Sequence, residues 1–138
     1  MSRISLICCL AEAGQLIQQE GPGWRLVRDP DRSPFSVLVG GEGWAFELTD
    51  SEWAALADVV GALVDQHRAL VDQLMDEESI ELELDRPPWW GCLDGTREQW
   101  SLSVVLSSTT ARSVEGGWGS PAAQAMAAAM QTLRETSL

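Results

Sequence analysis

One long amphipathic helix constrains the fold of this chain more than any other feature of the sequence. Residues 49–52 read Thr-Asp-Ser-Glu, a capping box that predicts a helix start at this point. Apolar residues then recur every three or four positions from Trp53 to Leu74. The acidic run 76–78 would oppose the helix dipole, so the helix should end near Met75. Small and branched residues widen the apolar stripe, which predicts that this helix covers a sheet.

Three segments of alternating apolar and polar residues precede the helix, at 24–28, 35–39 and 44–49. A loop rich in proline and aspartate, 29–34, separates the first from the second, and the glycine-rich segment 40–43 separates the second from the third. Short connections of this kind join antiparallel strands. The first half of the chain therefore predicts a three-stranded meander with one face toward the core.

The second half repeats this order with different residues. Strict alternation marks a half-buried strand at 80–85, which the segment Pro-Pro-Trp-Trp-Gly at 87–91 breaks. Two more strands are expected at 100–107 and 112–117. Ser-Pro at 120–121 provides an N-cap and a first helical position, and an alanine-rich helix should follow.

The predicted order is thus strand-strand-strand-helix, repeated twice, which is typical of an α+β fold. We expect antiparallel sheets with the long helix and a C-terminal helix packed on them. The two halves share little sequence beyond Gly-Gly-x-Gly-Trp at 40–44 and Gly-Gly-Trp-Gly at 116–119. We expect a single domain over 16–138, preceded by an N-terminal extension, 1–15, that forms an extra strand or a poorly ordered tail.

The N-terminal residues and the cysteines bear on cellular location. The apolar run from Ile4 to Leu10 is at the lower limit for a signal peptide, and its basic flank is weak, so we do not expect secretion. No segment approaches the ~20 apolar residues of a membrane span. Cys8, Cys9 and Cys92 are odd in number and lack CxxC spacing, which argues against a disulfide framework or a zinc site. Reduced thiols indicate a cytoplasmic protein.

Charge limits the classes of partner. The chain has 21 acidic residues against nine basic ones, all of them arginine, and its formal net charge is −12. Nucleic-acid binding needs cationic groups that displace counterions from phosphates, and a field this negative repels polyanions. Nucleic-acid binding is therefore disfavoured, although a local arginine patch could still exist.

No motif predicts catalysis, a cofactor or a metal site. His67 is the only histidine, and on an apolar helical stripe it is better explained as a hydrogen-bonded core residue than as a proton carrier. No serine lies in a GxSxG motif. The acidic residues between 76 and 85 lack calcium-loop spacing and predict a solvated face. Residues 40–43 lack the lysine and threonine of a phosphate loop and predict a hairpin turn.

Two groups of residues are the best candidates for a binding surface. One is an aromatic pair in a loop held by two prolines, and the other is an arginine cluster beside a tryptophan. Aromatic and arginine side chains together are typical both of protein hot spots and of base-stacking platforms. The alternative, that the tryptophans close the ends of the sheet core, stays open. The candidate residues are Trp24, Arg25, Arg28, Arg32, Trp89 and Trp90.

Five segments carry a resemblance to a known family: 21–26, 29–30, 38–49, 74–78 and 115–118. Together they resemble a small family of uncharacterised proteins from cyanobacteria and their plastid relatives, whose members begin shortly before the first of these segments. The resemblance implies a fold similar to that of Whirly-type transcriptional regulators, which bind single-stranded DNA. It supplies no catalytic residues.

The sequence favours a non-catalytic cytoplasmic binding or assembly protein that acts through protein–protein contacts at sheet edges or exposed tryptophans. The expected partner is a protein, and a second copy of the chain could fill that role in a homodimer. A single-stranded nucleic-acid-binding regulator is the alternative, supported by the resemblance and opposed by the charge. An enzymatic function has no positive support in the sequence.

Overall fold

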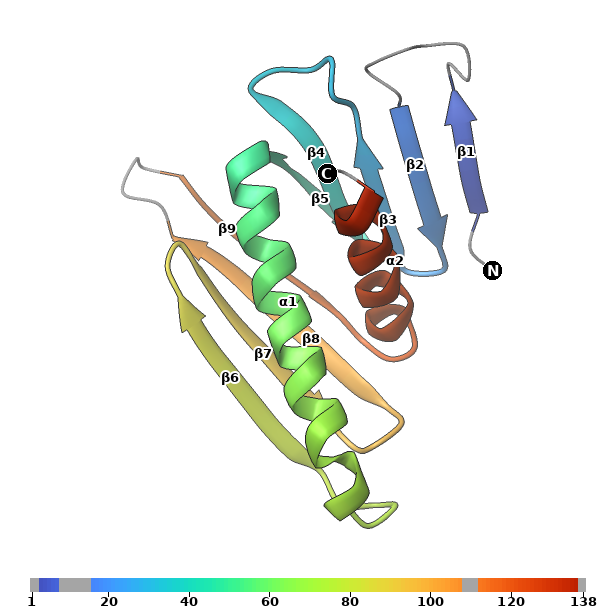
Figure 1. Cartoon of the computed structure of the whole chain (residues 1–138), viewed down its shortest axis with the longest axis vertical. Helices are drawn as coiled ribbons and strands as arrows, with labels where there is room; N and C mark the ends of the chain where they lie inside the picture. The colour runs from blue at the N-terminus through green and yellow to red at the C-terminus, as the bar shows by residue number, and fades with distance from the viewer. Residues whose placement is uncertain (1–2, 8–15, 108–111, 137–138) are drawn as a thin grey trace.

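The computed structural model describes residues 3–7, 16–107 and 112–136, which form two antiparallel sheets and two helices (Figure 1). The first sheet has the strand order β1-β2-β3-β4-β5, and the second has the order β6-β7-β8-β9. The strands of the first sheet are β1 (Arg3–Ile7), β2 (Leu16–Gly21), β3 (Trp24–Arg28), β4 (Phe35–Gly41) and β5 (Trp44–Thr49). Those of the second are β6 (Ile80–Arg86), β7 (Trp89–Gly95), β8 (Trp100–Ser107) and β9 (Ser113–Trp118).

Helix α1 (Asp50–Leu70) follows the first sheet and begins at the predicted capping box. The Thr49 hydroxyl accepts from the backbone N–H of Glu52 at 3.2 Å, and the Glu52 carboxylate accepts from the backbone N–H of Thr49 at 2.9 Å. The short 3-10 helix η1 (Val71–Gln73) extends α1 to just before the predicted end. The capping chemistry therefore fixes the helix start where the sequence places it.

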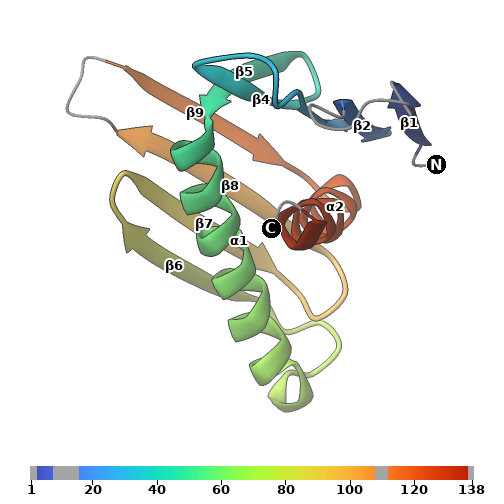
Figure 2. The ribbon, with the colours of Figure 1, turned by 45° about the horizontal axis from the view of Figure 1, so that its top comes forward.

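Helix α2 (Ala122–Thr136) ends the described chain, and its alanines let it approach both sheets closely. It contacts β2 and β3 of the first sheet and β8 and β9 of the second, while α1 contacts β4 and β5 on one side and β6 and β7 on the other. Both helices thus fill the angle between the sheets, as Figure 2 shows. We call the face of each sheet that packs on the helices its inner face, and the opposite face its outer face.

A single core lies between these layers. Its fully buried side chains come from both sheets and both helices, so the two halves of the chain fold as one body. The largest of them are Trp89, Leu26, Leu48, Leu56, Leu63, Leu93, Leu102, Leu106, Met126, Met130 and Leu133. Neither α1 nor α2 has the length and apolar composition that crossing a bilayer requires.

The predicted α+β class, with a helix after each sheet, is confirmed, but each sheet has more strands than the three expected. Strand β2 carries Gln-Gln-Glu at its centre, so it shows no apolar alternation. Strand β7 was missed because Gly91 interrupts its pattern; a Cβ there would lie 2.8 Å from Val59 of α1, so close helix packing requires the glycine. Strand β1 lies within the predicted N-terminal extension and pairs with β2.

Candidate functional site

Two neighbouring hairpins of the first sheet have tips of the same sequence, Gly-x-Gly-Trp. Residues 21–24 connect β2 to β3, and residues 41–44 connect β4 to β5. The second glycine of each tip has a positive φ, 80° at Gly23 and 81° at Gly43. Residues with a side chain rarely adopt this conformation, so both two-residue turns require glycine at this position.

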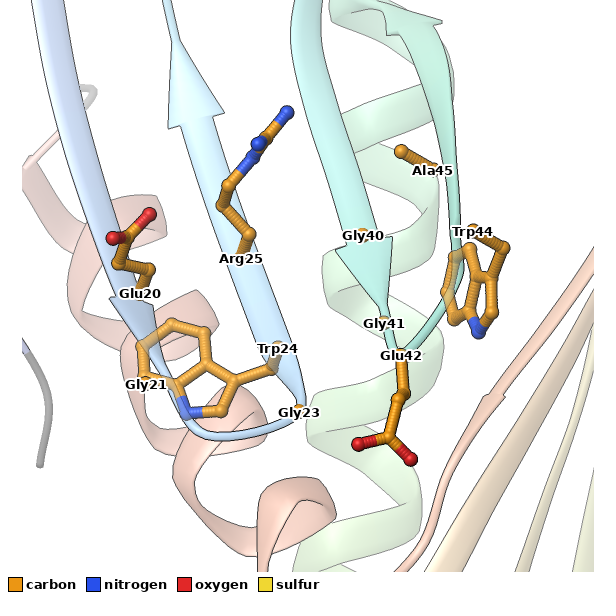
Figure 3. Close-up of a pocket in the computed structure, with 10 residues that line it drawn as sticks. All are labelled: Glu20, Gly21, Gly23, Trp24, Arg25, Gly40, Gly41, Glu42, Trp44 and Ala45. Atoms are coloured by element: carbon orange, nitrogen blue, oxygen red, sulfur yellow. The ribbon is translucent and has the colours of Figure 1, made fainter.

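The tryptophan of each tip folds back over the first glycine of its own turn. A Cβ on Gly21 would lie 2.5 Å from Nε1 of Trp24, and a Cβ on Gly41 would lie 2.5 Å from the ring of Trp44. Only glycine leaves room for the indole at either position. The repeated tip sequence therefore places a tryptophan side chain against bare backbone at each of two hairpin tips, at the same end of the sheet (Figure 3).

The end of β9 reaches the same place from the second sheet. A Cβ on Gly116 would lie 2.6 Å from Trp44, whose ring centroid is 5.1 Å from that of Trp118. Trp118 in turn donates its indole N–H to the carbonyl oxygen of Gly40 at 3.0 Å. The two glycine-tryptophan motifs at 40–44 and 116–119 thus contact each other and join the two sheets.

Two adjoining pockets lie at this junction, and we call them together the Trp44 groove. The first has a volume of about 350 Å³ and is lined by Glu20, Gly21, Gly23, Trp24, Arg25, Gly40, Gly41, Glu42, Trp44 and Ala45 (Figure 3). The second has a volume of about 420 Å³ and is lined by Pro22, Gly23, Glu42, Trp44, Gly117, Trp118, Gly119, Ser120, Pro121 and Ala122. Gly23, Glu42 and Trp44 line both pockets, so the two pockets adjoin at the hairpin tips.

Several polar groups in the groove have no partner among the residues that the structure describes. Within the described residues, Arg25 and Glu42 are exposed and take part in no ion pair. The indole N–H groups of Trp24 and Trp44 likewise donate to no acceptor in that part of the chain, whereas Trp118 is paired. Figure 3 shows both unpaired indole nitrogens and the Glu42 carboxylate at the tips of the hairpins. The groove therefore offers donors and an acceptor to a ligand.

The predicted arginine cluster does not form. Arg25 lies on the outer face of β3, and Arg28 lies on the inner face, where its Nε is buried without a hydrogen-bond partner. Arg32 lies in the loop after β3 and pairs with Glu47 at 2.8 Å. Of the three, the structure places only Arg25, with Trp24, in the groove.

The predicted aromatic loop at Trp89 and Trp90 is part of strand β7. Trp89 is 1% exposed and donates its indole N–H to the carbonyl oxygen of Glu52 at 3.0 Å, so it is a core residue. Trp90 is half-buried on the outer face, opposite Asp85 and Val105 of the neighbouring strands. Trp89 thus supports the alternative that tryptophans close the core, and Trp90 alone of the pair reaches the surface.

His67 and the acidic residues of β6 have the surroundings of structural residues and not of a reactive site. His67 is buried, lies 3.1 Å from the carbonyl oxygen of Thr96 through Nε2, and packs on Trp100, as expected of a core histidine. Glu81 and Glu83 are exposed on the outer face of β6, as expected of a solvated face. Among the described residues, no three His, Cys, Asp or Glu side chains gather in a way that could hold a metal ion.

Arg112, just before β9, binds the capping-box glutamate of α1. It contacts the Glu52 carboxylate and the carbonyl oxygen of Glu47, and its guanidinium lies 4.9 Å from the centroid of the Phe35 ring. Burial raises the pKa of Glu52, but hydrogen bonds from Arg112 and Thr49 outweigh it, so the net pKa lies below the ordinary value of 4.5. This pair ties the second sheet to the start of α1 and does not reach the groove.

The whole groove lies within the segment that a known family model matches. That model is the domain of unknown function DUF1818, and it matches residues 19–133. The chain belongs to the DUF1818 family. Both hairpin tips, β9 and the start of α2 are therefore parts of the DUF1818 domain, whereas β1 lies before it.

A solved crystal structure is similar to this DUF1818 chain. It is described as a protein with unknown function from the DUF155 family, from Prochlorococcus sp. NATL2A. The two are 42% identical with a TM-score of 0.80, over 84% of this chain and 97% of that one. The similarity extends the fold to a cyanobacterial protein and names no ligand or activity. No curated protein matches the chain.

The residues that sequence reasoning missed are Glu42 and Trp44, together with the rim residues Pro22 and Pro121. The sequence does contain a signal for Glu42 and Trp44. The tetrapeptide Gly-x-Gly-Trp occurs at 21–24 and again at 41–44, which predicts two equivalent turns. Pro121, just before α2, had no such signal, because its place beside the groove depends on how the two sheets meet.

Proposed function

We propose that this DUF1818 domain is a non-catalytic cytoplasmic protein-binding module, and that the Trp44 groove receives a segment of the partner protein. One observation carries the proposal. Three glycine-tryptophan segments, far apart in the sequence, converge on one groove whose central indole is only half-buried.

The shape and lining of the groove fit a peptide segment. Each pocket falls in the ~300–1,000 Å³ range of ligand sites. Nothing lies within 4 Å of a Cβ at Gly119 in the wall of the second pocket, and Pro22 and Pro121 add rigid apolar surface at the rim. Tryptophan supplies a large contact area at small entropic cost, which is why it is enriched in protein hot spots.

The charges of the groove favour a binding role over a reaction. Among the described residues, the ionisable ones that line either pocket are Glu20, Arg25 and Glu42, with no histidine, cysteine or lysine. Nucleophilic or acid–base catalysis commonly relies on such groups held beside a positioned partner. The groove instead presents unpaired hydrogen-bonding groups beside an aromatic surface, which supports recognition of another molecule.

A single-stranded nucleic-acid-binding role, implied by the resemblance to Whirly-type regulators, is the second candidate. Arg25 supports it, because an exposed guanidinium in the groove could contact a phosphate while a base stacks on the half-buried Trp44; Trp24 is only 4% exposed and belongs to the core. Glu20 and Glu42 oppose it, because they line the same groove and repel phosphates. A titration with single-stranded DNA at 50 and 200 mM salt tests it: salt-sensitive micromolar binding would favour this candidate over the first.

The protein-binding proposal is tested with a displayed random-peptide library selected on the immobilised full chain. Binding of the enriched peptides is then measured by calorimetry to the wild type and to two variants that fill the groove, Gly119→Trp and Ala45→Arg. Nothing lies within 4 Å of a Cβ at Gly119, and Ala45 is exposed, so both should fold. Ala69→Arg, at an exposed position on α1 outside the groove, is the matched control.

We expect the two filling variants to weaken peptide binding at least about tenfold, since they occupy the space of the ligand, and Ala69→Arg to leave it unchanged. Recovery of no peptide, or of peptides that bind Gly119→Trp and Ala45→Arg as tightly as the wild type, would show that the groove is not a protein-binding site.

A further inference from the structure

We infer that the partner segment is an extended peptide that carries an arginine or lysine side chain, and that this side chain binds against Trp44 and Glu42. The inference rests on the proposed function and adds the chemistry of the ligand.

Glu42 is the charged residue that both pockets share. It occupies the turn between β4 and β5, is exposed, and forms no ion pair in the described part of the chain. Of the described residues that line the second pocket, Glu42 alone is ionisable. A ligand side chain in that pocket therefore meets one carboxylate and no competing cation, which favours a positive charge.

Trp44 provides the second part of the recognition. Its indole lines both pockets beside Glu42, and its N–H has no acceptor within the described residues. The Trp44 ring stacks on Phe46 with centroids 5.3 Å apart and is half-buried, so a guanidinium or ammonium group of the ligand meets the exposed part of the ring. The Glu42 carboxylate beside it adds an ion pair. The unpaired N–H can at the same time donate to a carbonyl oxygen of the ligand backbone. A cationic residue within a peptide satisfies all three groups together.

The first pocket sets the direction of the peptide. Glu20 and Arg25 are cross-strand neighbours there, so the guanidinium of Arg25 offsets one carboxylate at that end. A cationic side chain is therefore favoured at the second pocket and disfavoured near Arg25. A partner segment should thus carry its basic residue at the end that lies near Pro121, and neutral or acidic residues at the other end.

The net charge of the whole chain also favours a basic partner segment. A formal net charge of −12 attracts basic segments over distances of about a Debye length and raises their association rate. It also repels acidic segments, so the field discriminates between partners before contact is made.

The test uses the peptides that the library selection yields and that Gly119→Trp excludes from the groove. Each is resynthesised with arginine replaced by citrulline, or lysine by norleucine, which removes the charge and keeps the approximate shape. We expect affinity for the wild type to fall about fivefold or more at 50 mM salt, and less at 500 mM. The same peptides should bind Glu42→Gln about as weakly as the neutral analogues bind the wild type.

Reversing the charge of residue 42 and of the ligand gives a second test. Glu42→Arg should bind the original peptide worst and should bind a peptide with glutamate in place of the basic residue better than the wild type does. Glu83→Arg, an equal charge change on the outer face of β6, is the control for the overall field. Groove-binding peptides whose affinity ignores citrulline and Glu42→Gln would overturn the inference and leave the protein-binding proposal standing. Failure to find any peptide that Gly119→Trp excludes would overturn both.

Discussion

The indole N–H of Trp118 donates to the carbonyl oxygen of Gly40 at 3.0 Å, in the buried seam where the two sheets meet. Trp118 ends β9 of the second sheet, and Gly40 lies in β4 of the first. The bond therefore joins segments that are 78 residues apart in the sequence. It also holds Trp118 against Trp44, and so fixes one wall of the groove.

Replacing Trp118 with phenylalanine should destabilise the protein by about 2–4 kcal/mol. The substitution removes a buried hydrogen bond, leaves the Gly40 carbonyl without its partner, and creates a small cavity. Trp100→Phe is the matched control, because Trp100 is also buried but its N–H has no acceptor within the described residues. Urea denaturation of both variants measures the difference. Equal decreases in the free energy of unfolding for the two variants would mean that the Trp118 hydrogen bond contributes nothing beyond packing.

Gly116→Ala should cost about 1–3 kcal/mol, because its Cβ would lie 2.6 Å from the Trp44 ring and the indole would have to move. Gly119→Ala should change the free energy of unfolding by less than about 0.5 kcal/mol, since nothing lies within 4 Å of that Cβ. Thermal and urea unfolding of the two variants measure this contrast. A tolerated Gly116→Ala would show that Trp44 does not rest on that glycine.

Much of the fold could be predicted from local patterns, and the exceptions have specific causes. The capping box at 49–52 and the alternation of β6 and β8 involve neighbouring residues, so the sequence displays them directly. Strand β7 was hidden by Gly91, whose missing side chain makes room for α1. Contacts of that kind depend on tertiary packing and leave no periodic signal.

The candidate site was less predictable than the fold, because it depends on which face of the sheet each residue occupies. Arg25, Arg28 and Arg32 are close in sequence, yet the strand sends the first two to opposite faces and Glu47 binds the third. Trp44 and Glu42 become neighbours of Pro121 only through the meeting of the two sheets. The repeated Gly-x-Gly-Trp predicts the turns but not what they face.

The free energy of unfolding should decrease as the pH falls, and part of this decrease should come from protonation of Glu52. Its pKa is below 4.5 in the folded protein, so its ionised form stabilises the fold above that pH. This contribution is lost as the pH falls below the ordinary value of 4.5 and through the lowered folded pKa. Glu52→Gln should therefore be less stable than the wild type at pH 7, and the difference should shrink toward pH 3.

Urea midpoints at pH 7, 5, 4 and 3 measure that difference, with Glu115→Gln at an exposed position of β9 as the control. A constant gap between Glu52→Gln and the wild type across this pH range would mean that the Arg112 and Thr49 contacts do not depend on the charge of Glu52.

Cys92 should react slowly with iodoacetamide. Burial raises the pKa of its thiol, and the charges of Glu81, Asp94 and Glu83 raise it further, so little reactive thiolate forms at neutral pH. We expect a rate at least about tenfold below that of free cysteine, and a faster rate in Glu81→Gln, which removes the carboxylate that accepts the thiol hydrogen bond. Site-resolved mass spectrometry measures the rate at Cys92. Reaction as fast as free cysteine would contradict the raised pKa.

The walls of the Trp44 groove come from residues 20–45 and from residues 117–122, near the two ends of the described chain. During synthesis, the first wall leaves the ribosome long before the second exists. A nascent chain, or one cut short before β9, has both hairpin tips but no opposite side to close against them. Any partner that recognises the complete groove would therefore distinguish molecules in which the two sheets have come together from chains that stop before β9.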